Sequence, residues 1–227
     1  MKLVEKEKPD IIFIQEPYLN KRKMTGITRT FRSYFSPEDN NRAAIVITNK
    51  EIDAVLITQL SSPDIVLLEI EFKNTKAFIA SAYFDITTKI GDELNRLDKI
   101  LEITKKHGIV IAVDSNSRSA AWHDIKTNKR GKILEEYMTS KDLYVMNESS
   151  ERTTFHNKRG QSNIDLTIVN KPLLKAIGEW DISDEESCSD HSIIKFSIGQ
   201  RNKPGRQHTH HGTRYIMNKT LADSTVI

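Results

Sequence analysis

Short apolar runs rich in Ile, Val, Leu and Phe recur through residues 1–198, and charged or polar segments separate them. Runs of this length with many β-branched residues are typical of β-strands. The pattern predicts strands at residues 10–16, 43–48, 53–59, 64–72, 76–84, 108–114, 143–147, 163–169 and 191–198.

Helical periodicity is confined to three segments, which are residues 2–8, 91–106 and 130–141. Between 91 and 106 the apolar side chains mostly recur three or four residues apart, and Gly108 then favours a helix end. Strands therefore outnumber helices, and the chain has no repeat and no regular alternation of strand and helix. These features favour one α/β domain in which two mixed sheets pack together and helices flank them.

The chain of 227 residues has a formal net charge of +3, but this charge is unevenly distributed. Residues 1–198 hold 29 basic and 30 acidic groups, whereas residues 199–227 hold five basic groups and one acidic group. The body is therefore close to neutral, and the positive excess belongs to the end of the chain. We expect one domain over residues 1–198 and a basic, flexible tail or linker over residues 199–227.

Composition excludes several classes of protein. The single cysteine, Cys188, excludes an internal disulfide and suits a reducing compartment. The apolar runs are too short for a transmembrane helix, and the charged residues that follow Met1 differ from a signal peptide. The sequence contains neither a glycine-rich phosphate loop before a helix nor a Gly-x-Ser-x-Gly nucleophile motif.

Four polar clusters lie at the ends of predicted strands, at residues 15–18, 114–117, 162–167 and 187–191. Each cluster alone is also typical of a turn, because Asp, Asn and Ser favour turns. Together they supply carboxylates, an amide and a histidine, without the Cys/His spacing of a zinc site. Oxygen ligands of this kind suit Mg2+, so the clusters favour metal-assisted attack of water on a phosphate ester.

The order of these motifs resembles the endonuclease/exonuclease/phosphatase superfamily, which has the fold of DNase I and the apurinic/apyrimidinic endonucleases. The resemblance is carried by Gln15-Glu16-Pro17, Tyr83, Asp114-x-Asn116, Ser162-x-x-Asp165 and Ser189-Asp190-His191. A narrower resemblance, to the endonuclease domain of arthropod non-LTR (LINE-type) retrotransposons, rests on Gln-Glu-Pro-Tyr, on Asp-Ser-Asn-Ser before Trp122 and on Thr154-Phe155. It spans about residues 3–198 and implies a DNase I-like four-layer α/β sandwich, with two packed mixed β-sheets flanked by helices.

Five residues correspond in this resemblance to metal-binding or catalytic groups. Glu16 and Asp190 match acids that bind or orient the metal, which is Mg2+ or, as an alternative, Mn2+. His191 matches the histidine that polarises the scissile phosphate or takes the proton of water, and Asp165 matches its carboxylate partner. Asp114 matches the acid that positions or deprotonates the water, or protonates the leaving oxygen. A hydrogen bond between Asp165 and His191 would fix the imidazole ring.

Four further residues correspond to groups beside the phosphate. Asn116 matches an amide that holds a phosphate oxygen, and Tyr83 matches a hydroxyl near the same phosphate. Thr154 and Ser189 match smaller hydroxyls on that side. Tyr83 lies among apolar residues, so a core tyrosine is the alternative interpretation.

Two basic segments are candidates for contact with DNA phosphates. Residues 126–132 hold four basic groups and no acid, and Lys158 and Arg159 lie in a loop between two apolar strands. Basic side chains of this kind supply salt-dependent affinity that is neutral to sequence. In the endonucleases that the chain resembles, the corresponding hairpin helps to choose the target. A solvated hairpin and an ordinary helix start are the alternatives.

The resemblance implies a Mg2+-dependent endonuclease that nicks double-stranded DNA in the nucleus for target-primed reverse transcription. In a full-length element its partner would be a C-terminal reverse transcriptase domain. The alternatives are an inactive remnant that binds DNA or protein, and a phosphomonoesterase of the same superfamily.

The chain departs from the family pattern near its start, since only fourteen residues precede Gln15. The family has an earlier strand whose Asn supports the metal-binding acid. We therefore expect a domain that lacks its first β-strand, in a fragment of a longer reading frame.

Overall fold

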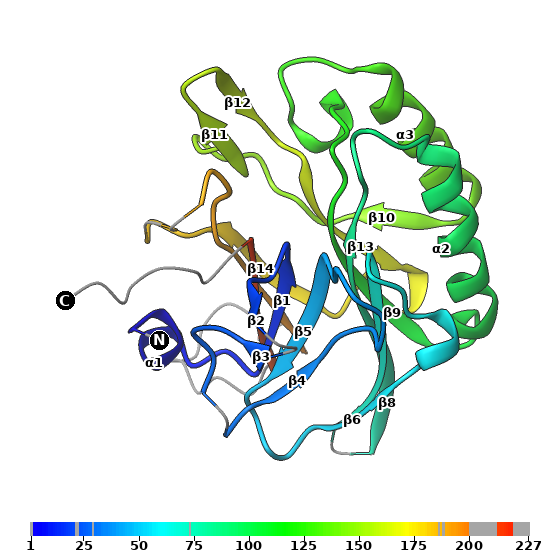
Figure 1. The fold of residues 1–227 in the computed structure, drawn as a ribbon. Helices are drawn as coiled ribbons and strands as arrows, with labels where there is room; N and C mark the ends of the chain where they lie inside the picture. The colour runs from blue at the N-terminus through cyan, green and yellow to red at the C-terminus, as the bar shows by residue number, and fades with distance from the viewer. Residues whose placement is uncertain are drawn as a thin grey trace, which may run out of the picture.

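The computed structural model describes residues 2–20, 23–28, 30–72, 74–185, 187, 189–199 and 213–219. Two six-stranded sheets make up its centre (Figure 1). The first sheet has the order β14 (Ile177–Ile182), β15 (Ile194–Ile198), β16 (Thr213–Lys219), β1 (Ile11–Gln15), β5 (Ala43–Ile47) and β4 (Arg32–Tyr34). The second has the order β10 (Leu143–Val145), β13 (Asp165–Asn170), β9 (Gly108–Asp114), β8 (Thr75–Tyr83), β7 (Ile65–Phe72) and β6 (Asp53–Leu56).

Alternation along β1 explains the two faces of the first sheet. Ile11 and Phe13 belong to the core between the sheets, whereas Ile12 and Ile14 face the other way. On that outer side they pack with Val4 of helix α1 (Lys2–Glu7). Successive side chains of a strand point to opposite faces, so a strand of continuous apolar residues needs a cover on both sides.

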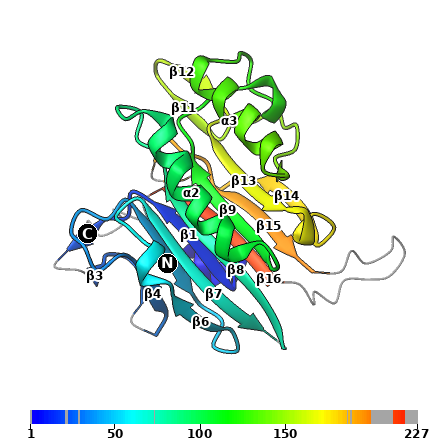
Figure 2. The same ribbon diagram turned by 90° about the vertical axis from the view of Figure 1, so that its right-hand side faces the viewer.

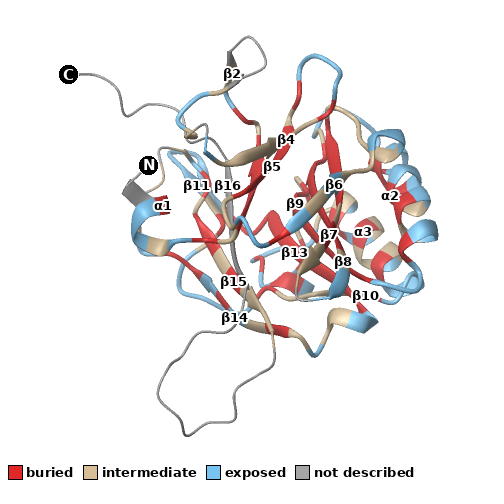
Figure 3. Ribbon diagram, turned by 90° about the horizontal axis from the view of Figure 1, so that it is seen from below, coloured by how far each residue is buried: buried red, intermediate tan, exposed pale blue. Residues whose placement is uncertain are grey.

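The second sheet is covered in the same way, by helices α2 (Ile90–Thr104) and α3 (Lys129–Ser140). In β9, Val110 points into the core between the sheets, and Ile109 and Ile111 join the apolar cluster that contains Leu97 of α2 and Leu134 of α3. Figures 1 and 2 show both helices lying along this outer face, and Figure 3 shows buried strands between layers with exposed outer surfaces. The result is the predicted four-layer α/β sandwich.

Each predicted strand and helix corresponds to an element of the structure, with shifts of a few residues at its ends. The sequence did not predict the edge strands β4 and β14 or the short hairpin β2 (Leu19–Asn20)–β3 (Lys23–Met24). These strands are short or mix polar with apolar residues, so no clear periodicity marks them. The hairpin predicted around Lys158 and Arg159 is present as β11 (Phe155–Asn157) and β12 (Gly160–Ser162). Among the described residues, no helix combines the length and apolar character that crossing a bilayer requires.

The tail differs in part from its prediction. Residues 213–219 form β16, which pairs parallel with β1 and antiparallel with β15; residues 200–212 and 220–227 lie outside the described part of the chain. Without a strand at this position, β1 and β15 would each present an edge of unpaired backbone groups in the middle of a sheet. Hydrogen bonding of the backbone therefore favours a strand where composition predicted a flexible linker.

A polar contact joins the two sheets near the carboxyl end of β1. The side-chain amide of Gln15, which is 1% exposed, donates to Ser81 Oγ on β8 at 3.0 Å and to the Ala112 carbonyl on β9 at 3.2 Å. Ser81 Oγ in turn donates to the Ile14 carbonyl at 3.1 Å. Because buried polar groups need such partners, these bonds fix the position of β1 relative to β8 and β9.

We expect Gly131→Ala to destabilise the fold by about 2 kcal/mol or more, because a Cβ at this position in α3 would lie 1.8 Å from the Arg118 carbonyl oxygen. Gly91→Ala in α2 is the matched control, since a Cβ there meets no atom within 4 Å, and a change below about 1 kcal/mol is expected. Urea unfolding of both variants measures the difference. Equal midpoints for the two variants would contradict the close approach of α3 to Arg118.

Candidate active site

Three predicted site residues lie side by side on neighbouring strands of the second sheet. Tyr83 ends β8 and Asp114 ends β9, and the two are partners in the parallel pair. Asp165 begins β13 and is the partner of Asp114 in the antiparallel pair. Directly opposed residues share a face of a sheet, and Val110 and Val169 show that this face points toward the first sheet. Pairing and alternation together thus gather three polar side chains at the open end of the core.

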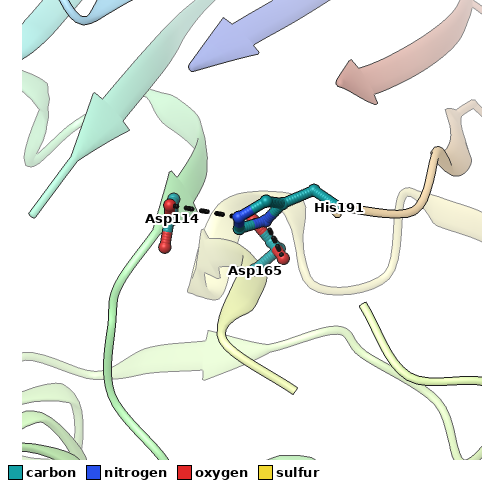
Figure 4. A group of neighbouring side chains, drawn as sticks. All are labelled: Asp114, Asp165 and His191. Atoms are coloured by element: carbon teal, nitrogen blue, oxygen red, sulfur yellow. Dashed lines mark hydrogen bonds and ion pairs between the residues drawn. The ribbon is translucent and has the colours of Figure 1, made fainter. Parts of the chain in front are cut away.

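His191 reaches this group from the segment that precedes β15 of the first sheet (Figure 4). Its Nδ1 lies 2.9 Å from both carboxylate oxygens of Asp165, and its Nε2 lies 3.9 Å from Asp114 Oδ2. His191, Asp165 and Asp114 are 5%, 3% and 0% exposed. The ring of Phe155 packs edge-on against the imidazole, with centroids 4.8 Å apart.

This geometry assigns distinct roles to the two imidazole nitrogens. An ionised carboxylate can only accept hydrogen bonds, so the Nδ1–H group donates a hydrogen bond to Asp165. This bond fixes both the tautomer and the plane of the ring. Nε2 is then the nitrogen on the side of Asp114, where it can exchange a proton or bind an oxyanion. His191, Asp165 and Asp114 also offer ligand atoms that all lie within 4.8 Å of one another, so they form a possible acidic metal site.

The two predicted metal ligands lie outside that group of three. Glu16 follows β1 directly and lines an open depression of about 650 Å³, together with Asp39, Asn41 and Asp64. Asp190 is exposed beside His191, and its Oδ2 accepts a hydrogen bond from the Asn157 side chain at 3.4 Å. Carboxylate and amide oxygens around Glu16 fit a hard cation such as Mg2+. Joint binding of one ion by Glu16 and Asp190 stays a prediction.

Glu16 and Asn116 both have left-handed backbone conformations, with φ of 50° and 47°. Such angles are uncommon outside glycine and persist where the surroundings hold them. The Glu16 N–H donates to the Arg42 carbonyl at 2.8 Å. The Asn116 N–H donates to Asp114 Oδ1 at 3.2 Å, and its side-chain amide donates to the Phe84 carbonyl at 3.0 Å. Two of the seven non-glycine residues with positive φ in the described part of the chain are therefore predicted site residues.

The hydroxyls of Thr154 and Ser189 hold backbone groups of the site. Thr154 is fully buried, and its Oγ1 accepts from the N–H groups of Ile164 at 3.0 Å and Asp165 at 3.1 Å. Ser189 Oγ accepts from the His191 N–H at 3.2 Å. Both hydroxyls thus accept hydrogen bonds from the main chain that carries the His191–Asp165 pair. Their contact with phosphate stays a prediction.

Lys158 and Arg159 form the turn of the β11–β12 hairpin, and both are exposed. Figure 1 shows this hairpin projecting from the end of the sandwich that carries the carboxyl end of β9. Its base is tied to the histidine segment, because the His156 N–H donates to the Asp190 carbonyl at 2.8 Å and Phe155 forms a β-bridge with His191. The hairpin and His191 therefore share one support.

Sequence reasoning missed Arg42 and Asp64, which lie next to Glu16 and Tyr83. Arg42 Nε donates to Asp64 Oδ1 at 2.6 Å, and the guanidinium carbon lies 4.9 Å from the centroid of the Tyr83 ring. Both residues precede apolar runs, a signal too common to single them out. Trp122 is a core residue, because it is 1% exposed and its indole N–H donates to the Ser117 carbonyl at 3.3 Å.

Comparison with known proteins agrees with this geometry. The endonuclease-reverse transcriptase family matches residues 77–195, a range that contains Tyr83, Asp114, Asp165 and His191. The chain is 28% identical over 190 residues to the 115 kDa protein in type-1 retrotransposable element R1DM of Drosophila melanogaster. It is 26% identical over 187 residues to the retrovirus-related Pol polyprotein from type-1 retrotransposable element R1 of Bradysia coprophila. These matches cover 80% and 78% of the chain but only 18% and 19% of the relatives.

Solved structures show the same fold. The endonuclease domain of TRAS1, a telomere-specific non-LTR retrotransposon, matches with a TM-score of 0.78 and 24% identity, covering 88% of this chain and 91% of that domain. The AP endonuclease LMAP from Leishmania major matches with a TM-score of 0.70 and 12% identity, covering 89% and 81%. The predicted resemblance and the predicted fold are both confirmed. With more than half of its length matched, the chain belongs to the endonuclease-reverse transcriptase family and has the fold of the DNase I-like endonucleases.

Proposed function

We propose that this domain is a metal-dependent endonuclease that nicks target DNA, so that the new 3′-hydroxyl primes reverse transcription of a non-LTR retrotransposon. The observation that carries the proposal is the buried His191 held between Asp165 and Asp114 at the end of the sandwich. Membership of the family and the relatives from R1 elements support it.

In this proposal His191 and Asp114 handle the protons of the reaction. Asp165 holds Nδ1 of His191, so Nε2 polarises the scissile phosphate or takes the proton of the attacking water. Asp114, whose Oδ2 lies 3.9 Å from Nε2 of His191, positions the water or protonates the leaving oxygen. Tyr83 ends β8 and Asn116 lies just after β9, and both would face the phosphate.

Glu16 and Asp190 would hold the metal, which we propose to be Mg2+, with Mn2+ as an alternative. When bound, a divalent ion supplies Lewis-acid stabilisation of the charge that develops on the phosphate. Ser189 and Thr154 would hold the main chain of His191 and Asp165 in place. Contact of their hydroxyls with the phosphate is a second proposed role.

The remaining parts of the proposal concern the longer protein. We assign residues 1–198 and strand β16 (Thr213–Lys219) to the endonuclease domain, because β16 lies between β1 and β15 in its first sheet. A linker to a reverse transcriptase domain would then follow β16. The chain spans about a fifth of the length of its curated relatives, so that domain would be the partner in a complete element. Action on chromosomal DNA places the proposed activity in the nucleus.

Incubation with supercoiled plasmid and Mg2+ tests the activity. We expect nicked circles from the wild type, a rate lower by about 10² to 10⁴ for Asp114→Ala and His191→Ala, and a smaller loss for Asp165→Asn because the ring loses only its orientation. EDTA should abolish nicking, and added Mg2+ or Mn2+ should restore it.

Lys141→Ala is the matched control, since it removes an exposed ion pair with Asp98 away from the site and should leave the rate unchanged. Equal nicking by wild type and both alanine variants would assign the activity to a contaminant. Absence of nicking by a folded wild type, with DNA still bound, would favour the inactive remnant, and release of inorganic phosphate without nicking would favour the phosphomonoesterase.

Lys158→Ala/Arg159→Ala tests the hairpin. Loss of two phosphate contacts should weaken DNA binding and reduce the slope of log Kd against log salt by about 2, because each contact with B-DNA contributes about 0.9. Fluorescence anisotropy from 50 to 200 mM salt, roughly the range over which such contacts dominate affinity, measures the slope.

Lys105→Ala/Lys106→Ala removes the same charge from exposed residues that follow α2, near the opposite end of β9. It should leave the slope as in the wild type. If both double variants change the slope equally, the effect is one of net charge and the hairpin has no special role.

A further inference from the structure

A cluster of charged side chains lies beside the proposed catalytic residues and takes no part in the chemistry described above. Arg42, which directly precedes β5, is at its centre. Its Nε donates to Asp64 Oδ1 at 2.6 Å, and its Nη1 donates to Asp85 Oδ2. Asp64 precedes β7 and Asp85 follows β8, so one guanidinium joins a residue of the first sheet to two segments of the second.

The same guanidinium lies over the ring of Tyr83, 4.9 Å from its centroid. A cation over an aromatic face is attracted by the ring quadrupole, and a planar guanidinium also packs flat against the ring. The main chain of Tyr83 also contacts this cluster, because its N–H donates to the Asp64 carbonyl at 2.8 Å. Arg42 and Asp64 therefore contact both the ring and the main chain of Tyr83.

The main chain of Arg42 contacts the other side of the site. Its carbonyl accepts the Glu16 N–H at 2.8 Å, and its own N–H donates to the Pro63 carbonyl at 2.6 Å. Glu16 has a φ of 50°, a conformation that needs support from its surroundings. Arg42 and Asp64 line the same depression as Glu16. A single residue thus supports the backbone of Glu16 and the ring of Tyr83.

Arg42 and Asp85 keep their charges across ordinary pH. The hydrogen bond with Asp64 raises the pKa of Arg42 above its usual value, although partial burial opposes the rise. The hydrogen bond from Arg42 lowers the pKa of Asp85 well below its usual range. Arg96 adds a second cation, 3.3 Å from Asp64 Oδ2 and 3.2 Å from Glu93 Oε2. Arg96 contacts Asp64 from the side of α2, whereas Arg42 contacts it from the side of Glu16 and Tyr83.

We propose that Arg42 is a positioning residue of the nuclease site, which keeps the Glu16 carboxylate and the Tyr83 hydroxyl in register by joining the ends of β1, β5 and β8. The proposal rests on the proposed function. Arg42 acts through Glu16 and Tyr83 rather than on the reacting atoms. A small displacement of groups around a reaction centre can cost about 10² in rate, so the expected effect falls on turnover and on the response to metal.

Arg42→Ala should lower kcat for plasmid nicking by about 10- to 100-fold, with a change in KM for DNA below about threefold. It should also raise the Mg2+ concentration that gives half of the maximal rate. The variant keeps the Arg42 carbonyl that accepts the Glu16 N–H, but it loses the ion pairs with Asp64 and Asp85 that anchor this segment. Arg42→Lys keeps a cation but cannot bridge two carboxylates and pack flat on a ring, so its kcat should lie between those of the wild type and Arg42→Ala.

A readout without turnover separates this proposal from the proposed function. Mg2+ that binds the folded state raises the Tm in proportion to the logarithm of its concentration. Arg42→Ala should need several times more Mg2+ than the wild type for the same rise in Tm, and Glu16→Gln should remove most of the rise. This measurement remains valid even if the wild type does not nick DNA.

Arg96→Ala is the matched control for stability. It also removes an ion pair with Asp64, but the other partner of Arg96 is Glu93 of the same helix. Its Tm should fall as for Arg42→Ala, while its kcat and Mg2+ response stay within about threefold of the wild type. The same kcat and Mg2+ response in Arg42→Ala and Arg96→Ala would overturn the proposal, as would wild-type values for Arg42→Ala.

Tyr83→Phe tests the route of the effect. If Arg42 acts partly by holding the Tyr83 hydroxyl, then Arg42→Ala should lower kcat less in the Tyr83→Phe background than in the wild type, which is the non-additivity expected of coupled residues. The shift in the Mg2+ response, which depends on Glu16, should remain in both backgrounds. Full additivity in kcat together with an unshifted Mg2+ response would show that the Arg42 side chain acts through neither Tyr83 nor Glu16, and would overturn the proposal.

Discussion

The two sheets meet face to face through one apolar core, in which Phe13 and Phe196 of the first sheet pack with residues such as Leu68 and Val110 of the second. The site depends on this contact, because His191 belongs to a segment of the first sheet and Asp165 to a strand of the second. Close-packed cores resist sliding, since a shift would open voids between interlocking side chains. The core therefore sets the distance between imidazole and carboxylate, and the buried amide of Gln15 adds a directional bond at the same end.

At that end the apolar core gives way to buried charge, which is tolerated only where partners are supplied. Asp165 has His191 as its partner, and Asp64 has Arg42 and Arg96. These pairs offset the free-energy cost of burying charge. Each also fixes the orientation of a side chain that faces either the depression lined by Glu16 or the space beside Asp114. Left-handed backbone at Glu16 and Asn116 belongs to the same pattern, because chain segments that leave a strand sharply place polar groups at its end.

The proposed substrate contact and the proposed catalytic histidine share a support in this fold. The β11–β12 hairpin carries Lys158 and Arg159 at its turn, while at its base Phe155 packs against the His191 ring and bridges the same segment. A displacement of the turn by bound DNA would therefore be transmitted to His191 through Phe155 and His156 at the base of the hairpin.

The solved structures at 24% and 12% identity, with TM-scores of 0.78 and 0.70, show that this scaffold tolerates wide change in sequence.

Alternating and near-continuous apolar runs sufficed to locate the long strands and the three helices, because period and burial are properties of a local segment. The order of acids, amide and histidine along the chain sufficed for the family. It also selected Asp114, Asp165 and His191, whose ligand atoms the structure brings within 4.8 Å of one another. The sequence alone did not predict β16, because its pairing with β1 and β15 is a property of the assembled sheet. Nor could it indicate that the Thr154 hydroxyl binds the backbone of Asp165, or that Arg42 meets Glu16 and Tyr83. Those contacts join residues far apart in the chain, and only the packing of one sheet on the other brings them within hydrogen-bonding distance.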